Sequence, residues 1–102
     1  MIHVFLDDRR SKPAGYKLAS TAQQAIRLLK KKKIGVLSLD YNLGAGRKKG
    51  LAVVEYMVKH RKYPRNIVIH SADRRGRKMM LRLLRKYKPK SVRVVVRPRK
   101  SI

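Results

Sequence analysis

The sequence predicts an α/β fold built on a five-stranded parallel sheet. Short apolar runs of strand length alternate with segments whose apolar residues recur at helical spacing, which is the pattern of β-α-β units. Residues 34–39 form a nearly continuous apolar run, as expected of a central parallel strand with both faces covered. Two of the runs end in aspartate, and functional groups of open α/β sheets collect beyond the carboxyl ends of strands.

The first part of the chain predicts two strands and a helix. Residues 2–6 are apolar, and a loop containing proline and glycine separates them from a short edge strand at 16–19. Ser20 then predicts a helix N-cap, with Gln23 as its capping-box partner. The apolar residues of this helix share one face, and they are Ala22, Ala25, Ile26 and Leu29.

The rest of the chain predicts two further β-α-β units. The strand at 34–39 is followed by a loop at 40–49 and a helix, then by a strand at 66–70. After a loop at 71–76, a third helix runs to Lys88-Pro89, and the last strand covers 92–96. The apolar positions of the second helix are Leu51, Val54, Met57 and Val58. Those of the third helix are Met80, Leu83, Leu84 and Tyr87.

These elements predict a three-layer, flavodoxin-like sheet of strand order 2-1-3-4-5. The first loop is too short to hold a crossover helix, so we expect the first and last helices of that topology to be missing. With 102 residues, the chain predicts a single domain over residues 1–102. It has no cysteine, no apolar stretch of membrane-spanning length and no signal-peptide pattern, so we expect a soluble, cytoplasmic protein.

The charge of the chain is extreme. It has 29 Lys and Arg residues against 5 Asp and Glu residues, a formal net charge of +24. Such a surface binds nucleic acid without a dedicated site, and its self-repulsion predicts a monomer at low salt. Deliberate recharging of the surface and a natural nucleic-acid partner would both leave this pattern, and both interpretations remain open.

Three of the five acidic residues are expected to meet at one edge of the sheet. Asp7 and Asp8 end the first strand, and Asp40 ends the strand at 34–39. Because Mg²⁺ prefers oxygen ligands, these carboxylates predict a magnesium site. The alternative is structural, with Asp8 capping a turn or pairing with Arg9 or Arg10.

Further polar residues are expected at the same edge. His70 predicts an acid–base or phosphate-binding group and Ser71 a hydrogen bond to a phosphoryl oxygen, although a histidine at a strand end is more often structural. Arg97 follows the last strand, where it would stabilise a bound phosphoryl group. Arg77 lies near the start of the third helix, which favours anion binding. Solvated surface is the alternative for both arginines.

Other motifs of nucleotide and metal sites are missing. The glycines of residues 44–50 miss the dinucleotide-binding pattern by one position and form no P-loop. The three histidines lack metal-ligand spacing. Aromatic residues are few and are not interleaved with basic residues along the chain, in contrast to RNA-stacking sheets.

The polar residues at the strand ends resemble those of response-regulator receiver domains. In that family the first acidic pair binds Mg²⁺ and the central aspartate accepts a phosphoryl group, roles that would fall on Asp7, Asp8 and Asp40. The serine or threonine of the family would correspond to Ser71. Its lysine would correspond to Arg97, which is a departure.

A narrower resemblance is to the cyclic-phosphate processing receiver-like family, which also lacks the first receiver helix. It rests on three segments, residues 6–15, 38–44 and 70–80. The resemblance implies a site for nucleotides or RNA ends with cyclic phosphates, with Arg9 among its ligand-binding residues. Two positions depart from the family pattern. Asn42 stands where the family usually has aspartate, and Asp73 stands where asparagine is common.

Three functions compete at this stage. The first is a receiver-like domain that binds or processes a cyclic-phosphate nucleotide with Mg²⁺, as a metal-dependent phosphoesterase using Asp40, His70 and Ser71. The second is a phosphoacceptor receiver in signalling, with Asp40 phosphorylated. The third is a basic nucleic-acid-binding module without catalysis.

Overall fold

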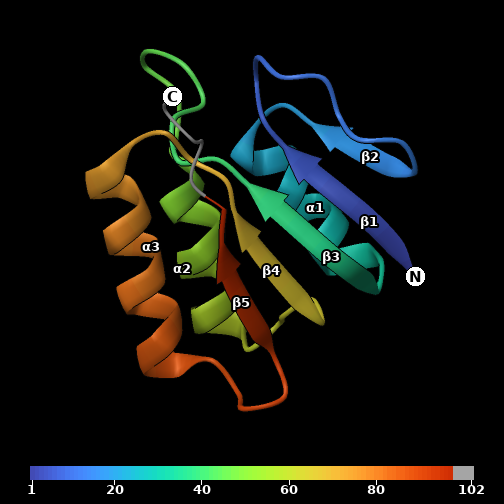
Figure 1. Cartoon of the computed structure of the whole chain (residues 1–102). Coiled ribbons are helices and arrows are strands. Elements are labelled where there is room, and N and C mark those ends of the chain that lie inside the picture. The colour runs from blue at the N-terminus through green and yellow to red at the C-terminus, as the bar shows by residue number, and fades with distance from the viewer. Residues whose placement is uncertain (98–102) are drawn as a thin grey trace.

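The chain folds into one parallel five-stranded sheet of order β2-β1-β3-β4-β5 (Figure 1). A computed structural model describes residues 1–97. The order and parallel pairing confirm the fold class expected from the sequence. None of the helices in these residues has the length and apolarity needed to cross a membrane. The elements are β1 (Ile2–Leu6), β2 (Tyr16–Ala19), α1 (Ala22–Lys31), β3 (Ile34–Leu39), α2 (Gly50–His60), β4 (Asn66–Ile69), α3 (Arg74–Tyr87) and β5 (Arg93–Val96).

All three helices cover the same face of the sheet. The steps from β2 to β3, from β3 to β4 and from β4 to β5 run in one direction across the sheet, and right-handed crossovers in one direction place their helices on one side. The contacts of α2 with both α1 and α3 agree with this single layer. The fold therefore has two layers instead of the expected three, because the missing first and last helices are those of the other face.

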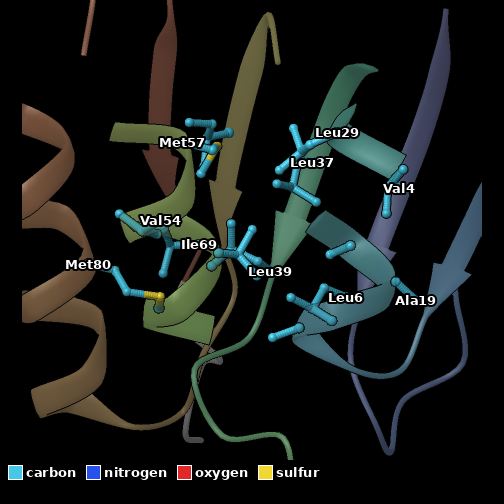
Figure 2. Close-up of a cluster of buried hydrophobic side chains, with 14 of the residues drawn as sticks. Val4, Leu6, Ala19, Leu29, Leu37, Leu39, Val54, Met57, Ile69 and Met80 are labelled. Atoms are coloured by element: carbon cyan, nitrogen blue, oxygen red, sulfur yellow. The ribbon is translucent and has the colours of Figure 1, made fainter. Parts of the chain in front are cut away.

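The core lies between the sheet and this helix layer (Figure 2). Strand residues of one parity, such as Leu37 and Leu39, point toward the helices and are fully buried. They meet the apolar faces of the helices, including Leu29, Val54 and Met80. The helical periodicity of the sequence correctly predicted these contacts.

Residues of the other parity form a helix-free face. The pairing of the strands aligns two rows across it, and the second row includes Phe5 and Ser38 of the central strands. At the ends of that row, Leu18 and Val95 are 46% and 42% exposed. The first row is Tyr16, His3, Val36, Asn66 and Arg93, and the second is Leu18, Phe5, Ser38, Val68 and Val95.

The sequence predicted the N-cap residues of two helices, one wrongly and one correctly. The N-cap of α1 is Thr21, whose Oγ1 accepts a hydrogen bond from Gln24 N at 3.2 Å, so the prediction of Ser20 was wrong by one residue. Ser20 instead donates its backbone N–H to the Gln24 side chain. Asp73 is the N-cap of α3 as expected, since its Oδ1 accepts from Gly76 N at 2.8 Å.

Replacing Gly50 with alanine is expected to destabilise the fold. Gly50 closes the loop that follows β3, where its N–H donates to Tyr41 O at 2.8 Å. A Cβ on Gly50 would collide with the backbone carbonyl oxygen of Asp40, which cannot move without moving the strand end. We expect a loss of about 1–3 kcal/mol in urea unfolding. Helix propensity alone predicts a gain of about 1 kcal/mol, so unchanged or higher stability would contradict this account.

Candidate acidic site

A depression of about 600 Å³ lies at the carboxyl edge of the sheet. It forms there because the chain leaves β1, β3 and β4 side by side: Asp40 N donates to Leu6 O, and His70 N donates to Leu39 O, each at 3.0 Å. The expected convergence of the acidic residues is therefore present. The lining includes Asp7, Asp8, Arg9, Arg10, Asp40, Asn42, Lys49, Ser71 and Asp73.

Asp7 is the buried member of the acidic cluster, with 2% of its surface exposed. Its Oδ1 accepts hydrogen bonds from the backbone N–H groups of Arg9 and Arg10, at 2.8 and 3.0 Å. Its Oδ2 lies 2.9 Å from His70 Nε2 and 3.8 Å from Arg10 Nε. These donors replace the water that a buried carboxylate loses, which allows an acidic residue to occupy this position.

His70 connects the acidic edge to the helix-free face of the sheet. Its Nδ1 lies 2.6 Å from Ser38 Oγ, while its Nε2 faces Asp7. The ring stacks on Phe5, with centroids 4.5 Å apart and planes 3° from parallel. If the Ser38 hydroxyl donates to Nδ1, the ring proton is on Nε2 and points at the Asp7 carboxylate. The sequence reasoning missed this chain of three side chains.

The pKa values of the pair describe an ionised Asp7 beside a neutral His70. Burial alone would raise the pKa of Asp7, but hydrogen bonds from the Arg10 and Arg9 backbone and from His70 hold it below its ordinary value of 3.8. Burial lowers the pKa of His70 below 6.5, and it outweighs the opposing effects of the hydrogen bond to Asp7 and of the nearby carboxylates.

These directions predict that acid destabilises the fold in two steps. The unfolded chain protonates His70 below pH 6.5 more readily than the folded chain does, so the free energy of unfolding falls from that pH downward. The free energy of unfolding falls a second time below pH 3.8, because there the unfolded chain protonates Asp7 more readily than the folded chain does. Urea unfolding at a series of pH values measures both. His70→Phe should remove the first contribution, and an unaltered pH profile in that variant would contradict the assignment.

The acidic cluster fits a hard cation held by oxygen. Ligand atoms of Asp7, Asp40 and His70 all lie within 4.8 Å of one another. The His70 nitrogen on this side is engaged with Asp7, so carboxylate oxygens are the donors that suit the site, and they match the preference of Mg²⁺. Asp40 is half-buried and Asp8 is exposed, and both line the depression.

The structure does not bring all the expected phosphate-binding residues together. Ser71 lines the depression but is fully buried, with its Oγ accepting from Asp73 N at 3.1 Å. Arg77 is not in the lining, and its Nη1 donates to the Ser71 carbonyl at 2.8 Å. Arg9 lines the depression, as does Arg10, which the sequence reasoning did not select as a ligand-binding residue. Arg97 instead lines a groove on the helix-free face, away from the lining of the acidic depression.

Asn42 remains part of the depression although it departs from the aspartate of the family pattern. Its Oδ1 accepts a hydrogen bond from Lys49 Nζ at 2.9 Å. This bond places a cation at the rim of the acidic site. Lys49 was also not selected from the sequence, because no pattern distinguishes it from the other lysines of this basic chain.

Comparisons with known proteins identify the family of the chain. One similar solved structure is a fusion of the yeast Spc42 trimeric coiled coil, amino acids 181–211, to another structure. It matches with a TM-score of 0.60 and 14% identity over 91% of this chain and 62% of that chain, a likeness of fold alone. No curated protein matches. The model of the cyclic-phosphate processing receiver domain matches residues 2–86, and the chain therefore belongs to that family.

Proposed function

We propose that the acidic depression binds a cyclic-phosphate nucleotide together with Mg²⁺ and hydrolyses the cyclic ester. The observation that carries this proposal is the convergence of Asp7, Asp8 and Asp40 with basic side chains at one edge of the sheet. The carboxylates are suited to a cation, and the surrounding Arg and Lys side chains are suited to a phosphate. Membership of a family associated with cyclic-phosphate processing supports the same class of ligand.

Asp7, Asp8 and Asp40 are the residues that would hold the cation. Bound Mg²⁺ supplies positive charge that offsets the negative charge developing on the phosphoryl oxygens. The Ser71 hydroxyl accepts a backbone hydrogen bond from Asp73 and has a proton to donate, but Ser71 is fully buried, so its contact with a phosphoryl oxygen would require this part of the depression to open. Arg9 lines the same depression and adds a second cationic contact.

In the proposed reaction one water molecule is added across the cyclic phosphodiester. Asp40 accepts a proton from the attacking water as its oxygen forms the new bond to phosphorus. The bond between phosphorus and one ribose oxygen breaks, and that oxygen takes up a proton to give a hydroxyl beside a phosphomonoester. Asp40 suits the role of base because it is half-exposed at the depression.

For His70 we propose a positioning role. It is 7% exposed and does not line the depression, and its Nε2 is hydrogen-bonded to Asp7. Because this bond fixes the orientation of the Asp7 carboxylate, His70 would act through Asp7, and solvent would supply the proton to the leaving oxygen. A direct proton transfer from His70, as the sequence suggested, would require the ring to leave its place between Phe5 and Asp7.

The test is turnover of a 2′,3′-cyclic nucleotide monophosphate in moderate salt. We expect a phosphomonoester product that forms with Mg²⁺ and does not form in EDTA. Lack of product with both Mg²⁺ and Mn²⁺ would contradict the proposal. In a parallel sample, acetyl phosphate distinguishes the alternative, because a phosphoacceptor receiver would gain the mass of one phosphoryl group on Asp40.

A further inference from the structure

The helix-free face of the sheet carries a groove of about 500 Å³, separate from the acidic depression. One wall is made by Pro13, in the loop between β1 and β2, and by Tyr16, the first residue of β2. Arg93 and Arg97 of the opposite edge also line the groove. Its floor is the sheet itself, where Val36 and Val68 are only half-buried because no helix in residues 1–97 covers them.

The residues of this groove have complementary chemistry. Tyr16 offers an aromatic ring, held by an edge-to-face contact with Phe5 at 6.4 Å between centroids and by a tilted contact with His3 at 5.5 Å. Arg93 and Arg97 are exposed cations. Within residues 1–97 no acidic side chain lines the groove. An apolar floor with an aromatic ring on one side and cations on the other matches a ligand with flat rings and negative charges.

We propose that this face binds single-stranded nucleic acid, with bases stacked on Tyr16 and phosphates contacting Arg93 and Arg97. Unpaired bases expose flat apolar faces, and stacking on aromatic side chains together with a basic groove is how single strands are commonly bound. A duplex hides those faces in its own stack, and an acidic protein partner would make no use of the aromatic wall. The net charge of +24 favours a polyanionic partner over any other class.

The pairing of the strands explains why the chain order conceals this surface. Tyr16 and Arg93 are far apart in the sequence, yet register places them in the same row across the sheet, from β2 at one edge to β5 at the other. An aromatic residue and basic residues therefore share one face of the sheet, at its two edges, although they are far apart along the chain. The proposal uses none of the acidic residues, so it is independent of the proposed hydrolysis.

The test is fluorescence anisotropy with a labelled oligo(dT) of about twelve nucleotides, in EDTA and about 0.15 M KCl. Arg93→Glu and the control Arg85→Glu both lower the net charge by two, from +24 to +22, and Arg85 is an exposed residue of α3 on the helix side. We expect Arg93→Glu to weaken binding at least about fivefold more than Arg85→Glu. Tyr16→Ala should weaken it roughly 5- to 100-fold, and Tyr16→Phe should not.

Binding through net charge alone would give equal losses for Arg93→Glu and Arg85→Glu, and that result would overturn the proposal. Equal affinity for a duplex of the same length, with the same loss in Arg93→Glu, would also overturn it. If Tyr16→Ala does not fold, the two arginine variants still decide the outcome, because both positions are exposed.

Discussion

Asp40→Asn is expected to lower turnover of the cyclic nucleotide by at least about 100-fold and to abolish the saturable response to Mg²⁺. Asparagine keeps the size of the side chain but supplies neither the negative charge for the cation nor a base for water. Asp40 is half-buried, and its backbone N–H is bonded to Leu6 O. We therefore expect the fold to remain, so the loss would come from the site.

Amide NMR during Mg²⁺ titration, in moderate salt, measures the binding part of this prediction. Saturable shifts are expected at Asp7, Asp8 and Ser71 in the unsubstituted chain and are expected to disappear in Asp40→Asn. Asp73→Asn is a matched control, because it removes the same charge from the same depression and asparagine remains a good N-cap for α3. Equal responses in the two variants would show that Asp40 has no special role.

Breaking the buried pair is expected to have the largest effect on stability. His70→Ala removes the side chain that is hydrogen-bonded to the Asp7 carboxylate and opens a space beneath Phe5. Asp7→Ala removes the acceptor of two backbone N–H groups. We expect each variant to lose about 2–4 kcal/mol in urea unfolding, from the lost hydrogen bonds of a buried ionised group and, in His70→Ala, from the space that opens. That loss is a large fraction of the stability of a small domain.

A double-mutant cycle over Asp7 and His70 separates the pair from its surroundings. The loss in the double variant should be smaller than the sum of the single losses by about 1–3 kcal/mol. His70→Phe keeps a ring to stack on Phe5 and so isolates the hydrogen-bonding part. Ser38→Ala, which removes only the bond to Nδ1, should lose about 1 kcal/mol. Strict additivity in urea unfolding would mean that the two side chains do not support each other.

The sheet and the acidic edge were predictable because they follow from local patterns. Strand and helix periodicities differ, and parallel strands of known order bring their carboxyl ends together, which was enough to place Asp7, Asp8 and Asp40. The two-layer arrangement was also within reach. Since the expected helices all join strands in one direction, the right-handed rule places them on one face, and the prediction of three layers did not apply that rule.

The row of hydrogen-bonded side chains Ser38, His70 and Asp7 was harder to predict because it depends on strand register. Ser38 interrupts an otherwise apolar strand, and the alternation of side chains places it on the same face as Phe5. His70 follows Val68 by two residues and so shares that face. The alternation of side chains along the strands therefore indicated the contact between Ser38 and His70. The hydrogen bond from Arg10 Nη1 to the His70 carbonyl depends on the path of a loop, which no periodic pattern predicts.

The span of the Asp7–His70 bond links the site to the order of assembly of the sheet. The two residues are 63 positions apart, so their contact closes a long loop, and the entropy of that closure must be overcome before the bond stabilises anything. β1 and β4 must both be paired with β3 before the two side chains can meet. Chains in which these three strands are not yet paired would therefore lack the site, and metal binding during refolding should not appear before they are.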